Sequence, residues 1–304
     1  MSPAPSADYG TEDVRAFAYF VAGLFAERTG KLEVAAELYT AATGMDPAYH
    51  KALNNRGLLI QAEGAQLYVK GGDDARARTM LEDAIGLFAR AKVLTSISEY
   101  HHNHATALSY LGRLDLRAGQ PNDALRRQKE SIVAYNEALA AVDREIAAAA
   151  ADAKAGRRAA RAEAVRRRAE REGFKRSVQV ALAISHVLAR ELDNDPRHES
   201  EAKEALDEVY RAFARQTRVA SHPKLEYNLA CYFAVTKDVK QAKSLFLTLR
   251  AVIPDLARIV LSDPDLVASP EILAMFAPGA AAPATPAPPI PPGADEDPDR
   301  DEPT

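Results

Sequence analysis

Apolar residues recur with a helical period along most of the chain. In residues 17–47, FAYFVAGLFAERTGKLEVAAELYTAATGMDP, apolar positions return at intervals of three and four residues on both sides of Thr29-Gly30. This spacing gives a helix one apolar face. Pro47 ends the second helix, because proline cannot continue one. The stretch therefore predicts two antiparallel helices joined by a short turn.

The pattern returns further along the chain. Gly57 follows Gly23 by 34 residues, and residues 107–125 and 226–256 repeat the same order of small and large apolar positions. Repetition at this period indicates stacked hairpins, because one hairpin cannot bury its apolar face alone. The sequence therefore predicts an all-α fold.

A further helical pair is expected between the third and fourth units. It comprises residues 174–192 and 198–216, which the segment DNDP joins. In residues 256–273, the segment SDPDL predicts the stop of one helix and a new start at Ser262 or Asp263. This last stretch is expected to cap the array, since terminal repeats need a polar outer face.

The first unit resembles a tetratricopeptide repeat (TPR). Eight positions of that family's signature are filled acceptably, by Tyr19, Ala22, Gly23, Ala26, Ala35, Tyr39, Ala42 and Pro47. The second unit departs from the pattern, because its turn KGGDDA arrives about eight residues late. The resemblance implies an all-α, TPR-like helix-turn-helix solenoid over residues 11–277, with a concave face that holds a peptide or another protein.

Groove positions carried over from the TPR family give candidate partner-binding residues. They include Phe20, Lys51, Asn54, Arg113, Arg117 and Tyr227, along with Phe17, Leu58, Gln61 and Cys231. The arginines could hold an acidic peptide, because a guanidinium offers a planar fork to carboxylates. The other interpretation is that these residues are ordinary polar positions on a solvated helix face.

One long Ala- and Arg-rich helix is expected over about 122–172, with Gly156 as its one plausible break. A continuous helix of this length would span roughly 75 Å, too long for one repeat. Between Lys154 and Arg176 the chain carries ten basic and three acidic residues. At about 100° per residue, four of the arginines fall on one stripe, namely Arg157, Arg161, Arg168 and Arg171.

Three interpretations of this basic stripe stay open. The first is a solvated face supported by ion pairs along the helix. The second is contact with an acidic protein surface, including the chain's own acidic tail. The third is binding of the nucleic-acid backbone, which needs no aromatic side chains. The net charge of −4 shows that the molecule as a whole is not a polycation.

Residues that point to enzyme chemistry are sparse. His101, His102 and His104 in HHNH are the sharpest metal candidates, but no cysteine or carboxylate other than Glu99 accompanies them at motif spacing. Packing histidines are the favoured interpretation. Cys231 is the single cysteine and is expected to be a small buried residue. We expect a protein that is not an enzyme and holds no cofactor or metal.

The termini and the compartment follow from composition. Residues 1–10 and the Pro-rich, acidic segment 278–304 offer almost no large apolar side chains and are expected to be disordered. No signal peptide is visible at the N-terminus, and no stretch approaches the ~20 apolar residues of a membrane helix. We therefore expect a cytoplasmic protein that does not enter the membrane.

Overall fold

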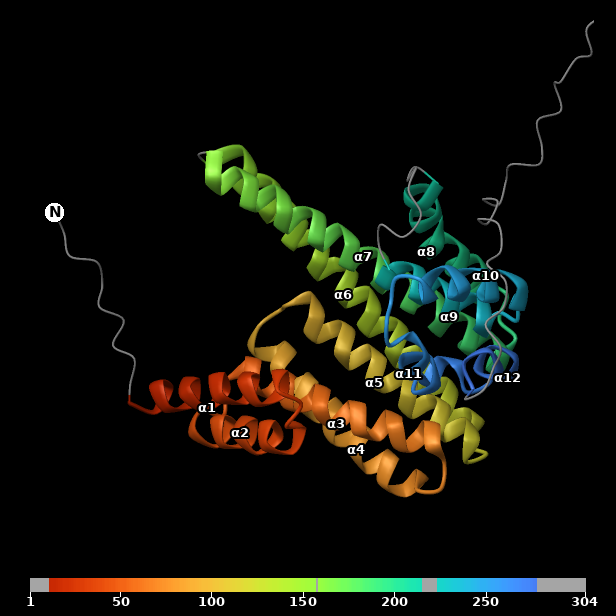
Figure 1. Cartoon of the computed structure of the whole chain (residues 1–304), viewed down its shortest axis with the longest axis horizontal. Coiled ribbons are helices and arrows are strands. Elements are labelled where there is room, and N and C mark those ends of the chain that lie inside the picture. Colours follow the sequence, from red (N-terminus) through yellow and green to blue (C-terminus); the bar gives the residue numbers. More distant parts are fainter. Residues whose placement is uncertain (1–10, 157, 215–222, 278–304) are drawn as a thin grey trace, which may run out of the picture.

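The computed structural model describes residues 11–156, 158–214 and 223–277 as helices and short connections, with no β-strand among them (Figure 1). The first seven helices are α1 (Thr11–Arg28), α2 (Leu32–Met45), α3 (His50–Lys70), α4 (Asp74–Leu94), α5 (Ser98–Arg117), α6 (Pro121–Ala155) and α7 (Arg158–Asp193). The others are α8 (Arg197–Ala214), α9 (Pro223–Val235), α10 (Val239–Arg250), α11 (Leu256–Leu261), the 3-10 helix η1 (Pro264–Leu266), α12 (Pro270–Leu273) and the 3-10 helix η2 (Ala274–Phe276). The all-α prediction is confirmed for this part of the chain. The terminal segments that were expected to be disordered lie outside it.

Successive helices pack against each other as antiparallel pairs. In five of the tight turns, one or two residues take a left-handed backbone conformation, which reverses the chain in few residues. These residues are Gly30, Gly71, Gly72, Gly119, Asn194 and Lys237. The turns expected at Thr29-Gly30 and at DNDP are both present.

Close contact within the pairs explains the recurring glycines. A Cβ added at Gly23 would lie 2.5 Å from the Tyr39 ring, and one at Gly112 would lie 2.9 Å from Nε2 of Gln128. Each contact joins residues 16 positions apart. At Gly57 the clash would be with Phe88, at 2.7 Å.

The late turn of the second unit accounts for the larger separation there. Each helix of that pair is longer by about seven residues, so the position facing Gly57 moves by roughly twice that number. Both helices have 21 residues, whereas α1 and α2 have 18 and 14. The repeat is therefore lengthened at its turn, and the packing of the pair is preserved.

The helix expected over about 122–172 is two helices. It breaks at Gly156, and α7 runs back antiparallel to α6 as a long arm that projects beyond the other pairs (Figure 1). The backbone N–H of Gly156 bonds to the carbonyl of Asp152 at 2.9 Å, and a Cβ at Gly156 would lie 3.0 Å from that oxygen. This tight reversal favours glycine. The arm also continues without interruption into the segment 174–192, which was expected to begin a separate helix.

The C-terminal segment returns to cover the array. Asp263 caps η1 by accepting a 2.8 Å hydrogen bond from the Asp265 backbone N–H, as expected from SDPDL. Leu266 and Ile272 are fully buried and share one cluster with helices α7 to α10. Because η1 also contacts α3 and α9, we call the side of α3, α5 and α9 that meets η1 the inner face.

Candidate functional site

Arg113, at the centre of the inner face, is already bound by the protein's own C-terminal segment. Its guanidinium donates a 3.0 Å hydrogen bond to the Pro264 carbonyl and forms an ion pair with Asp265. The side chain is 9% exposed. Burial works against the charged guanidinium, but the Asp265 carboxylate outweighs it and raises the pKa of Arg113. The acidic ligand that was predicted for Arg113 is thus an Asp-Pro-Asp segment of the same chain.

Tyr227 is engaged by the same segment. Its hydroxyl donates a 2.6 Å hydrogen bond to Oδ2 of Asp263. Burial, together with the nearby Asp265 carboxylate, raises the pKa of Asp263 from 3.8 to about 6. The Cys231 thiol lies 3.8 Å from the same oxygen, and burial followed by this carboxylate raises its pKa. A thiol held in its neutral form is a poor nucleophile.

The other predicted groove residues fall into two groups. Phe20 is buried against Tyr39 and Tyr49, and Asn54 is buried with its Oδ1 accepting from Asn103 at 2.9 Å. These residues hold the fold together.

Arg117 and Lys51 lie nearer the surface. The Arg117 guanidinium covers the Tyr68 ring at 3.8 Å, donates to the Tyr68 carbonyl at 2.7 Å and pairs with Asp74 at 3.2 Å. Lys51 is exposed and forms no ion pair within the described part of the chain. Only Lys51, of the six residues, therefore keeps its side chain free.

Two cavities remain along the inner face. One of 160 Å³ lies beside Arg113 and Tyr227 and is also lined by His102, Thr106 and Lys224. The other, of 400 Å³, lies between α3 and α11. The predicted groove positions Leu58 and Gln61 line the second cavity, and Oε1 of Gln61 is buried without a hydrogen-bond partner. This second cavity is the part of the inner face that the C-terminal segment leaves open.

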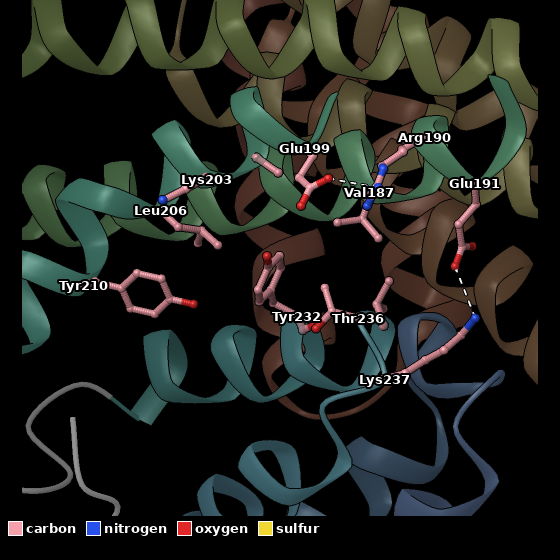
Figure 2. A pocket seen from close by; sticks show the side chains of 12 residues that line it. Val187, Arg190, Glu191, Glu199, Lys203, Leu206, Tyr210, Tyr232, Thr236 and Lys237 are labelled. Atoms are coloured by element: carbon pink, nitrogen blue, oxygen red, sulfur yellow. Dashed lines mark hydrogen bonds and ion pairs between the residues drawn. The ribbon is translucent and has the colours of Figure 1, made fainter. Parts of the chain in front are cut away.

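A third cavity, of 480 Å³, lies between α7, α8 and α9 (Figure 2). Tyr232 and Leu206 face it, and its charged groups are paired: Arg190 with Glu199 at 2.9 Å and Lys237 with Glu191 at 3.6 Å. These pairs leave apolar and tyrosine side chains as the surface offered to a ligand.

The histidines of HHNH point to different surroundings. Nδ1 of His101 lies 3.0 Å from Glu137, while the His102 ring packs against Tyr135 and Phe174. Burial lowers the pKa of both His102 and His104 from 6.5 to about 4. The three rings do not converge on one point.

The basic stripe is largely neutralised by acidic residues of the protein itself. Arg168 pairs with Glu172 at 2.8 Å, and Arg171 pairs with Glu145 at 3.3 Å and with Glu99. Arg161 is exposed and has no ion pair among the described residues, and Arg157 lies outside them.

Ion pairs also join the two helices of the arm. Arg167 pairs with Asp152 at 3.0 Å and Lys175 with Asp143 at 3.0 Å, so basic residues of α7 meet acids of α6. Along α7 itself, the expected pair of Arg166 with Glu170 is present at 3.0 Å. The expected partners Arg167 for Glu163 and Arg176 for Glu172 are replaced by Arg166 and Arg168. The basic residues of the arm thus stabilise the hairpin itself.

A different surface stands out when equivalent helix positions are compared. In α3, Ala52 is fully buried in a cluster with α2, Leu59 packs against that cluster, and Asn55 donates to the Tyr39 hydroxyl at 3.3 Å. These three positions of α3 are covered by the preceding pair. We call them, and their equivalents in the other helices, the stacking face.

The stacking face of α5 is covered in the same way. Gly112 lies 55 residues after Gly57, which makes Ala107 and Leu114 equivalent to the first and last positions in α3. Ala107 shares a buried cluster with Ala84 and Phe88 of α4. Leu114 shares another with Ala77 and Leu81.

The stacking face of α1 is uncovered. Moving back by 34 residues from α3 leads to Ala18, Val21 and Phe25, and all three are exposed. Phe25 is 70% and Val21 44% exposed, and Val14 and Phe17 beside them are 56% and 57% exposed. Large apolar side chains grouped on one surface indicate an interaction site. Sequence periodicity could have located this face, but the groove positions drew attention instead.

No helix of the described residues has the length and apolar character that a membrane span requires. The sequence matches none of the protein-family models against which it was compared, and no curated protein is similar to it. The likeness to the TPR signature therefore rests on the residues quoted above.

Proposed function

We propose that this protein is a TPR-like helical-repeat scaffold that binds a partner protein on the stacking face of α1. One observation carries the proposal. The equivalent faces of α3 and α5 are covered by the preceding helix pair, whereas Val21 and Phe25 of α1 are exposed. A repeat array stacks through repeated interfaces, so this face fits a helix placed as α2 is placed on α3.

The covering helices indicate what the partner helix carries. Each has a buried triad at positions i, i+4 and i+7, with a small residue at both ends and a large one between. The triads are Ala35, Tyr39 and Ala42 in α2, and Ala77, Leu81 and Ala84 in α4. A partner helix with this spacing would bury Val21 and Phe25. Each fully buried side chain of this size contributes about 1.5–3 kcal/mol before the costs of association.

The inner face is less suited to this role than expected. Arg113 and Tyr227 are held by the C-terminal segment, whose Leu266 belongs to the core. Displacing that segment would expose a fully buried leucine. The cavity lined by Leu58 and Gln61 stays open and can extend an interface that begins on α1.

Nucleic-acid binding by the arm receives little support. Phosphate contacts need available cations, and Arg168 and Arg171 of the basic stripe are engaged by neighbouring glutamates. Arg161 is the exposed and unpaired member of that stripe among the described residues.

The test uses a double substitution on the stacking face. A photoreactive amino acid in place of Phe17 identifies partners in the cells that make the protein, and the partner is then purified and its affinity measured. We expect Val21→Glu with Phe25→Glu to weaken binding at least tenfold, because carboxylates cannot be buried unpaired at a helix contact. Val133→Glu is the matched control, since Val133 is 59% exposed on α6, away from α1.

Either of two results would overturn the proposal. In the first, the partner binds the double variant as tightly as the unchanged protein. In the second, Val133→Glu weakens binding equally. Sedimentation of the purified protein separates one further case, because a dimer that the double variant breaks would make a second copy the occupant of this face.

A further inference from the structure

A second group of residues, far from α1, has the arrangement of a metal site. His186 on α7 and His198 on α8 face each other with their Nδ1 atoms 3.0 Å apart. Oε2 of Glu201, one turn after His198, lies 3.1 Å from the first Nδ1 and 3.5 Å from the second. Three atoms that commonly bind metals therefore meet at one point between two helices.

The spacing of these atoms suits a tetrahedral ion. Zinc binds imidazole nitrogen and carboxylate oxygen at about 2.0–2.2 Å, which places two ligands of a tetrahedral site about 3.3 Å apart. The three observed separations lie on both sides of that value. Contacts of 3.0 and 3.1 Å also use only one of the two available imidazole N–H groups per ring, and a neutral ring has only one to donate.

The ring of His198 supplies an independent observation. Its Nε2 is buried and has no hydrogen-bond partner, although Oδ2 of Asp193 lies 3.5 Å away. An imidazole that binds a metal through Nδ1 carries its proton on Nε2, and such ligands usually direct that proton at a carboxylate. Asp193 is placed for this role and is itself fixed by Lys129 at 3.0 Å.

Other combinations of nearby groups are less suited. Asp193 and Asp195 could join Nε2 of His198, but they are already paired with Lys129 and Arg197. Glu201, in contrast, faces the two imidazoles and has no lysine or arginine partner among the described residues.

The group of Cys231, Asp263 and Asp265 is also excluded by its neighbours. Arg113 neutralises Asp265, and Tyr227 occupies Asp263. A cation would have to compete with a buried guanidinium there.

We propose that His186, His198 and Glu201 bind a divalent transition-metal ion such as Zn²⁺, which links α7 to α8. His186 and Glu201 also line a cavity of 580 Å³, so a water molecule can reach the fourth position. The site differs from the expectation of no metal, which considered only HHNH. It stands apart from the surface of α1 and does not depend on the proposed function.

Zinc binding is measured on the untagged full-length chain after treatment with a chelator. Calorimetric titration with ZnCl₂ should show one ion per chain, and the melting temperature should rise with Zn²⁺ because the ion binds the folded state. We expect Glu201→Gln and His198→Gln each to weaken binding strongly. Asp193→Asn should weaken it by roughly tenfold through the second ligand shell.

Glu199→Gln is the matched control, because Glu199 lies on the same turn and pairs with Arg190 instead (Figure 2). It should leave zinc affinity unchanged. Circular dichroism checks that each variant folds, and Glu201 is half exposed, so its variant tests the site even if a histidine variant unfolds. Absence of saturable binding by the unchanged protein, or equal affinity of the Glu201→Gln and Glu199→Gln variants, would overturn the proposal.

Discussion

The two ends of the helical array are finished differently. At the C-terminal end, α11, η1, α12 and η2 fold over the last pair, and Leu266 and Ile272 are fully buried there. At the N-terminal end, α1 presents Val21 and Phe25 to solvent on the face that α3 and α5 bury. The same helical surface is thus core in the interior of the molecule and exposed at its beginning. This difference separates a closed end from an end that can accept another helix.

The largest effect is expected from breaking the closed end at Arg113. Arg113→Ala removes the partner of the Asp265 carboxylate and leaves charge uncompensated in a buried setting, which costs about 3–5 kcal/mol. Urea unfolding measures the loss. Arg76→Ala is the control, because both partners in its pair with Glu63 are about half exposed. Equal losses in the two variants would contradict the role given to Arg113.

A second difference between the two ends lies in their buried titratable groups. His102 lies close enough to α9 for Lys224 to act on it, and burial, followed by that lysine, lowers its pKa to about 4, with Glu99 opposing. The unfolded chain therefore binds more protons between pH 6.5 and about 4. Stability present above pH 6.5 is lost as the pH falls through this window, by up to about 3 kcal/mol for this residue.

The pH dependence can be tested with His102→Phe, which keeps a ring against Tyr135 and Phe174. The free energy of unfolding of this variant should fall less steeply between pH 6.5 and 4. Asp263 acts in the opposite direction in part of the same window, because its raised pKa of about 6 removes stability as the pH rises from 4 to 6. An unchanged slope for His102→Phe would contradict the assignment.

Local pattern was enough to predict the helix pairs, because spacing of apolar residues and turn glycines acts over a few residues. Gly156 was recognised as a break, but whether the chain continues straight or reverses there depends on what α7 packs against. The contact of Arg113 with Pro264 joins residues 151 positions apart, and no local signal reports it. The pairing of His186 with His198 was missed because the two lie on different helices across a turn.

Within the array, the close contact of the pairs predicts a smaller effect. Gly57→Ala places a Cβ 2.7 Å from the Phe88 ring and should cost about 1–3 kcal/mol through overpacking. Gly86→Ala lies in the facing helix with no atom within 4 Å of the new Cβ. That variant should gain about 0.5–1 kcal/mol from helix propensity. Thermal unfolding of both shows whether the signs differ, and equal effects would rule out the stated packing.

The smallest effect on stability is expected at the open end. Phe25→Ser changes a side chain that is 70% exposed, so the free energy of unfolding should move by no more than about 0.5 kcal/mol. In the closed end, Leu266→Ala should cost about 3–5 kcal/mol, because it leaves a cavity in the core. A comparable loss for Phe25→Ser would mean that the stacking face of α1 is already covered.

The most direct test places one tryptophan on that face and adds a repeat in front of it. The chain has no tryptophan, so Phe25→Trp gives a single fluorescent probe, and a second copy of residues 11–44 is joined before Thr11 with the 34-residue period kept. We predict that the added hairpin shifts the emission from that of an exposed indole to that of a buried one and raises the melting temperature. Unchanged emission, with circular dichroism showing that the added hairpin is folded, would contradict the claim that α1 carries an open stacking face.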